Sequence, residues 1–273
     1  MGKQMSKTRP PVSARQENFL RAHRRHHHRI AFGRILLLFL FLGFWETASR
    51  MAWLDSFFFS SPSGIIRYLG QMLTDGSFFT HTGITLFETI ASFILVTVLS
   101  LVSATLLWYQ NSLSEILEPY LVVLNALPKS ALAPLLIVWL GTGSNTIIVA
   151  GISVAVFGSI ISLYTGFCQV DPEMCKLIYT LGGSRRDALV KVILPSSIPL
   201  ILSSMKVNIG LSLVGVIIGE FLAARRGLGY LIIYGSQVFQ LNMVITSIII
   251  LCAIAMVFYK LIQSAEHYYK KQY

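Results

Sequence analysis

Residues 171–195 combine charged side chains, a glycine pair and two prolines in a pattern suited to binding a partner rather than to catalysing a reaction. Asp171 can cap a helix that has Pro172 at its first position. An apolar stripe follows at helical spacing, formed by Met174, Leu177, Ile178 and Leu181. A helix with one apolar face is a common element for docking into a groove on another protein.

A second short helix is predicted after the pair Gly182-Gly183. Ser184 and Asp187 have the spacing of a capping box, and the helix is expected to run to Leu194 and to stop at Pro195. The residues leave two interpretations open. In the first, the segment docks on a partner protein. In the second, it is an interfacial helix or a plain loop at the bilayer surface.

The elements that must hold this segment are apolar helices. Of the 273 residues 54% are hydrophobic and 12% are charged, about half the charged share of a typical soluble domain. The mean hydropathy is +0.67. These values predict an all-α membrane protein. Six stretches are long enough to cross a bilayer as helices, at residues 30–49, 84–108, 120–140, 146–167, 198–222 and 243–262.

Charge between the spans predicts the orientation. Nine of the 22 lysines and arginines lie in the first 34 positions, so residues 1–29 form a basic tail, which favours the cytoplasmic side. Six spans return the tail 266–273, with Lys270 and Lys271, to that side, and residues 171–195 face it too. Two loops carry charges that disagree with this orientation. The loop placed on the cytoplasmic side has Glu115 and Glu118, and the loop placed outside has Arg225 and Arg226.

Residues 50–83 become an external segment in this arrangement, and residues 84–265 the core. A short amphipathic helix is expected after Ser61-Pro62-Ser63-Gly64, with Ile65, Ile66, Leu69 and Met72 on its apolar face.

Polar residues inside apolar spans are costly and mark interior or functional positions. Candidates for the lining of a translocation path are Asn125, Pro128, Lys129, Ser130, Asn208 and Glu220. The favoured alternative for Lys129 is a snorkelling side chain beside a proline kink. For Glu220 it is a local ion pair or cap near Arg225 and Arg226. Asn208 and Lys206 are interpreted as structural, and small residues such as Gly151, Gly210, Gly215 and Gly219 as sites of close helix packing.

No catalytic or metal-binding constellation stands out. The histidines at 23 and 26–28 alternate with arginines that would repel a cation, which favours a basic membrane-facing tail. The three cysteines have no metal-ligand spacing. No G-x-x-x-x-G-K-[ST] motif is present to cradle ATP phosphates. We therefore expect no enzyme activity, no metal, no cofactor and no nucleic-acid partner for this chain.

The segment resembles the "EAA" loop of ABC importer permeases, through Glu173-Met174-Cys175, Gly182 or Gly183, and Ile193-Leu194-Pro195. Further similarities to the nitrate/sulfonate/taurine-type subfamily follow in order along residues 55–265. They are Ser61-Pro62-Ser63, Thr85-Leu86, Leu127-Pro128, Ala133-Pro134-Leu135, Trp139-Leu140-Gly141, Gly219-Glu220 and Arg226-Gly227-Leu228-Gly229. Glu88 departs from the pattern, because many relatives have an arginine there.

The resemblance implies a type I (MetI-like) importer permease with six transmembrane helices in a bacterial cell membrane, with both termini cytoplasmic. Two permease copies would surround a path for a small anionic or polar organic solute. A cytoplasmic ATPase dimer would use ATP and Mg²⁺, and an extracytoplasmic binding protein would deliver the solute. The ATPase-coupling residues implied are Glu173, Leu177, Leu181, Gly182, Gly183, Arg185, Arg186, Leu194 and Pro195.

Two other classes of protein remain as alternatives. An ATP-independent secondary transporter or channel would be expected to show inverted repeats and paired interrupted helices, and no internal symmetry is apparent in the sequence. An intramembrane enzyme would need a histidine- or aspartate-based constellation at membrane depth, and the sequence offers none.

Overall fold

The computed structural model describes residue 30, residues 33–34, 36–37, 39–51 and 60–272, with side chains up to residue 268. The chain divides into two units, Met1–Ser63 and Gly64–Tyr273. The expected basic tail 1–29, with its histidines, lies outside the described residues, as do the side chains of Lys270 and Lys271.

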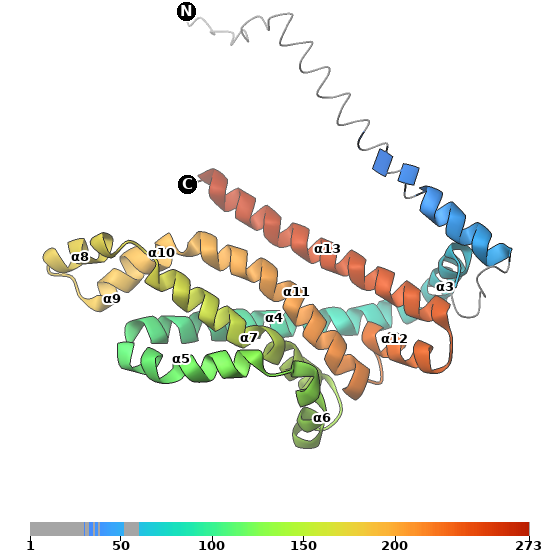
Figure 1. Cartoon of the computed structure of the whole chain (residues 1–273), viewed down its shortest axis with the longest axis horizontal. Helices are drawn as coiled ribbons and strands as arrows, with labels where there is room; N and C mark the ends of the chain where they lie inside the picture. Colours follow the sequence, from blue (N-terminus) through green and yellow to red (C-terminus); the bar gives the residue numbers. More distant parts are fainter. Residues whose placement is uncertain (1–29, 31–32, 35, 38, 52–59, 273) are drawn as a thin grey trace, which may run out of the picture. The chain divides into compact units, whose positions relative to one another are not determined.

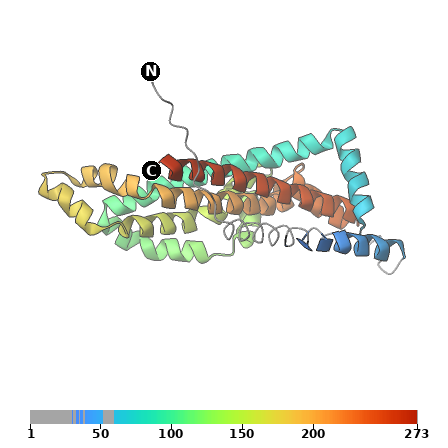
Figure 2. The same ribbon diagram turned by 90° about the horizontal axis from the view of Figure 1, so that it is seen from above.

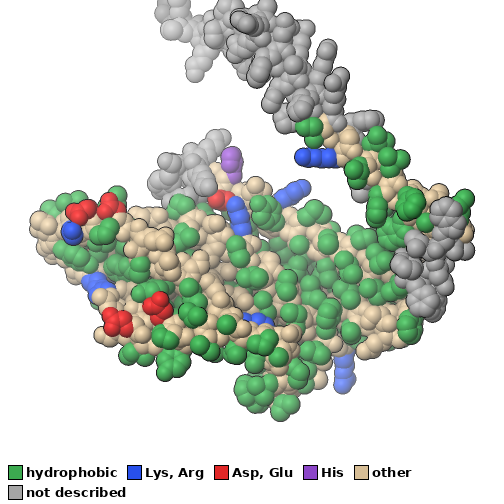
Figure 3. Space-filling view, viewed as in Figure 1, with side chains coloured by type: hydrophobic (Ala, Val, Ile, Leu, Met, Phe, Trp, Pro, Cys, Tyr) green, Lys and Arg blue, Asp and Glu red, His purple; other side chains and the backbone are tan. Residues whose placement is uncertain are grey.

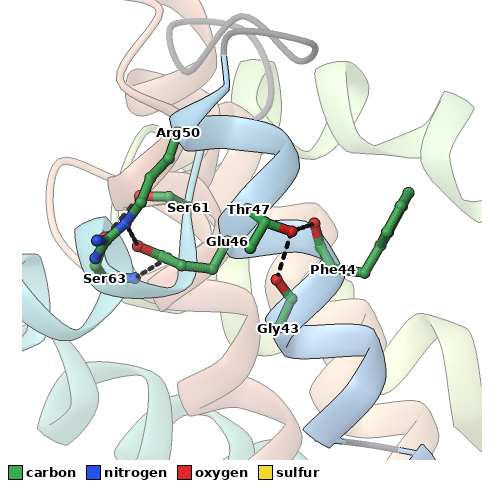
Figure 4. A network of polar contacts seen from close by, with 7 residues as sticks. All are labelled: Gly43, Phe44, Glu46, Thr47, Arg50, Ser61 and Ser63. Atoms are coloured by element: carbon green, nitrogen blue, oxygen red, sulfur yellow. Dashed lines mark hydrogen bonds and ion pairs between the residues drawn. The ribbon is translucent and has the colours of Figure 1, made fainter.

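In the first unit, residues 39–50 form a helix that overlaps the expected span 30–49 and ends one residue beyond it. Glu46 accepts a hydrogen bond of 2.7 Å from Nε of Arg50 and one of 3.1 Å from the backbone N–H of Ser63 (Figure 4). The Thr47 hydroxyl donates to the carbonyl oxygen of Gly43 at 2.9 Å. Glu46 therefore ties the end of this helix to the chain segment just before the second unit.

In its described residues the second unit has helices as its only regular secondary structure, joined by short turns (Figure 1). Its helices are α3 (Pro62–Thr74, beginning at the boundary between the units), α4 (Ser77–Tyr109), α5 (Asn111–Ala126), α6 (Lys129–Leu140), α7 (Ser144–Cys168), α8 (Pro172–Thr180), α9 (Arg185–Ala188), the π-helix η1 (Leu189–Ile193), α10 (Leu194–Ser196), α11 (Ile198–Ala223), α12 (Leu228–Gln237) and α13 (Leu241–Gln272).

Four of these helices, α4, α7, α11 and α13, are long and apolar enough to cross a bilayer, in agreement with the expected second, fourth, fifth and sixth spans. The described residues therefore contain four such helices, or five spans if the bent pair α5 and α6 is counted as one, and the expected count of six is not confirmed. Hydrophobic side chains cover the middle of the second unit, and charged ones gather at the end that carries α8 and α9 (Figure 3).

The expected third span, 120–140, is not one helix. It consists of α5 and α6, which are bent by 96° at the break between them. Leu127 has an extended backbone, at φ −60° and ψ 137°, because the ring of Pro128 disfavours a helical conformation for the residue before it. Pro128 itself is extended too. The break falls at the proline where the sequence indicates a kink, and the bend divides the expected span into two helices.

The core of the second unit is the packing of α7 along both α4 and α11 (Figure 2). A Cβ atom on Gly215 of α11 would lie 2.7 Å from Cα of Gly151 on α7, and one on Gly219 would lie 3.0 Å from Cα of Ile147. Small residues therefore let the two backbones approach closely, as expected. Gly210 has open space around its Cα, so its expected packing role is not found within the described chain.

Helix α3 is amphipathic, as predicted, with Ile65 and Met72 buried. Ile66 is 71% exposed, contrary to its expected place on the apolar face. Met72 packs into a cluster with Leu228 of α12 and Ile250 of α13. This cluster lies at the end of α11 opposite to α8 and α9.

Candidate functional site

Helix α8 is fixed at its start by the predicted cap. The Asp171 carboxylate accepts a 2.9 Å hydrogen bond from the backbone N–H of Glu173, and Pro172 is the first helical residue. Both signals are therefore confirmed. Because the cap satisfies an N–H group that would otherwise lack a partner, it defines where the helix begins.

The end of α8 is fixed by the glycine pair. Gly182 has φ +81°, a left-handed conformation that favours glycine. Its N–H donates to the Tyr179 carbonyl at 3.0 Å, and the N–H of Gly183 donates to the Ile178 carbonyl at 2.9 Å. These two bonds form a Schellman motif. A Cβ on Gly183 would lie 2.5 Å from the Ile178 side chain, so this turn is tightly closed.

Helix α9 begins with the capping box that the sequence predicts. The Ser184 hydroxyl accepts a hydrogen bond from the N–H of Asp187, and the Asp187 carboxylate accepts one of 3.0 Å from the N–H of Ser184. Lys191 lies 3.0 Å from the same carboxylate. The hydrogen bonds from the Ser184 side chain and backbone, followed by the contact with Lys191, hold the pKa of Asp187 well below its ordinary value.

The helix after the capping box does not stop at Pro195, contrary to the prediction. It widens into the π-helix η1 and continues as α10 before α11 starts at Ile198. Pro195 has no N–H to donate to the preceding turn, and the wider π-turn lies directly before it. Leu189 and Ile193 are buried against Phe167 and Ala104, with Leu194 partly buried beside them, while Pro195 is exposed. The second helix is therefore anchored in the bundle.

The outer face of α8 is an uncovered apolar stripe, which we call the α8 stripe. It consists of Met174, Leu177 and Leu181, whose exposed fractions are 51%, 60% and 76%. Cys175 packs on the other side against the cluster that contains Phe167. Glu173 forms an exposed ion pair of 2.7 Å with Lys176. An apolar stripe beside charged groups, on a helix fixed at both ends, has the features of a docking surface.

Arg185 and Arg186 have different environments. Nη2 of Arg185 donates to the Trp108 carbonyl oxygen at 2.7 Å and to Oδ1 of Asn111 at 2.6 Å. Its guanidinium carbon also lies 5.4 Å from the centre of the Trp108 ring. Arg186 is exposed. Arg185 therefore connects the docking element to the junction of α4 and α5, a role that the sequence did not reveal.

At the opposite end of α11, Glu220 is 1% exposed. Its carboxylate accepts hydrogen bonds from the Thr85 hydroxyl at 2.6 Å and from the backbone N–H of Gly229, near the start of α12. Glu220 therefore caps α12, and no ion pair with Arg225 or Arg226 is found in the described part of the chain. Its candidate role in lining a path stays a prediction.

Residues of α4 complete this polar cluster, and sequence reasoning did not group them with Glu220. The Thr85 hydroxyl oxygen accepts the N–H of Leu228 at 2.9 Å, and Nδ1 of His81 accepts the N–H of Gly227 at 3.0 Å. Glu88 is also 1% exposed. The signal that could have found them is the one-turn spacing of His81, Thr85 and Glu88 on one face of α4.

The remaining path candidates divide between two places. Asn125, Pro128 and Ser130 are exposed at the break between α5 and α6, where the Lys129 ammonium group donates to the carbonyl oxygens of Leu124 and Asn125. Asn208 is buried between α11 and α7 and donates to Ser159 at 2.8 Å. The structure brings the first four residues together. Asn125 approaches Gly158 of α7, which is next to Ser159, the partner of Asn208, whereas Glu220 lies near the end of α11.

Comparisons with known proteins agree with this geometry. Residues 96–267 match the family described as "Binding-protein-dependent transport system inner membrane component". A probable ABC transporter permease protein of Haemophilus influenzae is 28% identical over 226 residues, which are 82% of this chain and 91% of the relative. A putative aliphatic sulfonates transport permease protein of Bacillus subtilis is 25% identical over 220 residues, or 81% of this chain and 80% of the relative.

The fold has a counterpart among solved structures. A chain of the MetNI methionine ABC transporter, in inward-facing conformations, superposes with a TM-score of 0.61 at 16% identity. The match covers 73% of this chain and 96% of that chain. The chain therefore belongs to the inner membrane components of binding-protein-dependent transport systems, and it is the permease subunit of an ATP-driven ABC importer whose ATP is hydrolysed by a separate subunit.

Proposed function

We propose that the α8 stripe docks in a groove on the ATPase subunit and is the contact through which ATP hydrolysis drives this permease. The observation that carries the proposal is the exposure of Met174, Leu177 and Leu181 on a helix whose two ends are held by hydrogen-bonded caps. A rigid helix with an uncovered apolar stripe can transmit force, because it does not deform when its partner moves.

Movement of α8 would reach the membrane helices by two connections. Ile193 and Leu189 pack the η1 segment against Phe167 of α7, and η1 leads through α10 into α11. Arg185 joins α9 to the carbonyl oxygen of Trp108 at the end of α4. These contacts make α4, α7 and α11 the helices that a displacement of α8 would tilt.

The assembly proposed around this surface has two copies of the permease and two ATPase subunits. In it both termini and α8 face the cytoplasm, and the binding protein approaches from the end that carries α12. The exposed residues at the break between α5 and α6, with Lys129 among them, would line a path between the two copies. A cation there suits an anionic or polar organic solute, and a relative from Bacillus subtilis is named a permease for aliphatic sulfonates. The chain itself would bind no cofactor, and the ATPase would bind ATP and Mg²⁺.

The test is a charge inserted in the α8 stripe. Leu181→Glu and Leu177→Glu should abolish co-purification of the ATPase and binding-protein-dependent uptake, while the permease stays in the membrane. Tyr179→Glu is the matched control, because residue 179 is two positions from each leucine and faces the other side of the helix. Retained ATPase binding in both leucine variants would overturn the docking surface.

A further inference from the structure

Two buried carboxyl groups meet where α4 and α11 contact the start of α12. Glu88 of α4 and Glu220 of α11 are each 1% exposed. Glu220 accepts a hydrogen bond from Thr85, which lies three residues before Glu88 in α4, so the two carboxyl groups belong to one buried cluster. Docking of the ATPase on the α8 stripe does not involve this pair.

Both oxygens of Glu220 already accept hydrogen bonds, one from a side-chain hydroxyl and one from a backbone N–H. One accepts from the Thr85 hydroxyl at 2.6 Å and the other from the N–H of Gly229. The Thr85 hydroxyl oxygen also accepts the N–H of Leu228 at 2.9 Å, and the hydroxyl lies closer to Glu220 than to its other acceptor, the His81 carbonyl oxygen at 3.2 Å. A Cβ on Gly227 would lie 2.4 Å from the carboxylate, so the turn before α12 closes directly over it. The surroundings of Glu220 are therefore those of an ionised acceptor.

Glu88 has the opposite surroundings. One of its oxygens, Oε2, is buried and has no hydrogen-bond partner among the residues that the structure describes. No lysine or arginine in the described part of the chain forms an ion pair with Glu88 or with Glu220. A buried carboxylate with neither a cation nor enough donors is strongly unfavourable, whereas a protonated carboxyl group can donate to a neighbouring acceptor.

We propose that Glu88 and Glu220 form a proton-binding site, in which Glu88 carries one proton taken from bulk water and donates it in a hydrogen bond to the Glu220 carboxylate. Two contacting carboxylates in a buried site cannot both be ionised without a large electrostatic cost, and a single shared proton removes it. The pair then carries one negative charge, which Thr85 and Gly229 stabilise.

The other ionisable groups at this end of the bundle do not supply a countercharge to the pair. On α4 the next one is His81, whose Nδ1 accepts the N–H of Gly227. The turn before α12 carries Arg225 and Arg226, and α12 contributes Tyr230, which stacks on the ring of His81, and Tyr234. Among the described residues at this end of the bundle, none therefore replaces the shared proton as the neutralising charge.

Infrared spectroscopy of the purified full-length permease in lipid provides the test. A protonated carboxylic acid has a carbonyl stretch that ionised carboxylates lack. At neutral pH the wild-type protein should show this band, and it should shift when glutamate is labelled with ¹³C. The band should disappear in Glu88→Gln and persist in Glu115→Gln, a control at an exposed glutamate of α5.

Thermal unfolding separates the roles of the two residues. Glu88→Gln replaces the donating O–H by an amide N–H, so its midpoint at neutral pH should match that of the wild type. Glu220→Gln turns an amide donor towards either Thr85 or Gly229, so its midpoint should fall by several degrees. A lower unfolding midpoint for Glu88→Gln than for Glu220→Gln would overturn the assignment of the proton to Glu88.

The wild-type measurement does not depend on any variant folding. Absence of the labelled carbonyl band at neutral pH would overturn the proposal. A wild-type thermal unfolding midpoint that rises with sodium chloride but not with choline chloride would also overturn it. The pair would then hold a metal cation in place of the proton. None of these measurements involves the ATPase or transport, so their outcome is independent of the docking proposal.

Discussion

Arg185 of α9 donates from Nη2 to the carbonyl oxygen of Trp108 near the end of α4, at 2.7 Å. These residues are 77 positions apart in the sequence. The bond joins the element that carries the α8 stripe to one of the three central helices. The same nitrogen reaches Asn111, so one side chain holds α9 against both α4 and α5.

Arg185→Ala should weaken this connection. Hydrogen bonds to a charged group contribute about 1.5–3 kcal/mol each, and the partly exposed position of Arg185 favours the lower end. We expect a lower thermal midpoint for the purified permease and slower uptake, with the ATPase still bound. Arg186→Ala removes the neighbouring exposed charge and should leave the midpoint unchanged. Equal midpoints for the two variants would show that the contact with Trp108 contributes nothing.

Gly182→Ala tests the turn between α8 and α9. At φ +81° an alanine side chain crowds the following carbonyl oxygen, at a cost of about 1–2 kcal/mol. The Schellman bonds should fray, and ATPase-coupled uptake should fall with little loss of folded protein in the membrane. Glu173→Gln, which removes the charge beside the α8 stripe, should act in the same direction. Unchanged uptake in both variants would count against the coupling role of this segment.

Gly70→Ala is the matched control for Gly182→Ala. Gly70 lies inside α3 and has open space around its Cα. Alanine is about 0.5–1 kcal/mol more favourable than glycine within a helix. This substitution should therefore leave uptake unchanged and stability unchanged or slightly higher.

The parts of this fold that sequence reasoning predicted are those controlled by neighbouring residues. The cap at Asp171, the capping box of Ser184 and Asp187, and the turn at Gly182 are local hydrogen-bond patterns, and all three are present. The apolar spans follow from hydropathy, because a bilayer cannot satisfy exposed backbone groups. Similarity to a family added the partner that such a loop would bind.

The parts that sequence reasoning missed depend on contacts distant in the chain. Nothing near Arg185 indicates that it turns towards Trp108 while Arg186 faces solvent. The cluster of Thr85, Glu88 and Glu220 exists only because α4 and α11 pack against the same helix. Likewise, a proline signals a break in a helix, but its 96° bend is set by how α5 and α6 pack on α7.

Asp187 should make the stability of the α9 capping box depend on pH. Its pKa is lowered in the folded protein, chiefly by Ser184 and then by Lys191, from an ordinary value of about 3.9. A lowered folded-state pKa gives stabilisation that is complete above the unfolded-state value and is lost as the pH falls towards the folded-state one. Hydrogen exchange at residues 184–190, corrected for intrinsic rates, should therefore accelerate below about pH 4.

Two variants separate the contributions to this pH dependence. Asp187→Asn should exchange faster at neutral pH and show little further change on acidification, because its side chain does not titrate. Lys191→Met should keep most of the wild-type dependence, since the Ser184 bonds lower the pKa of Asp187 more than Lys191 does. A wild-type profile as flat as that of Asp187→Asn would contradict the assignment.

The contact between α7 and α11 leaves no space for a side chain at Gly215. A Cβ there would lie 2.7 Å from Cα of Gly151 and 3.0 Å from the Ala150 carbonyl oxygen, both backbone atoms that cannot move aside cheaply. Gly215→Ala should therefore lower the unfolding free energy by about 1–3 kcal/mol, measured by thermal or denaturant unfolding in detergent. Gly210→Ala is the control on the same helix, because its Cα faces open space and alanine favours the helix. Equal unfolding free energies for Gly215→Ala and Gly210→Ala would contradict the close contact between α7 and α11 at Gly215.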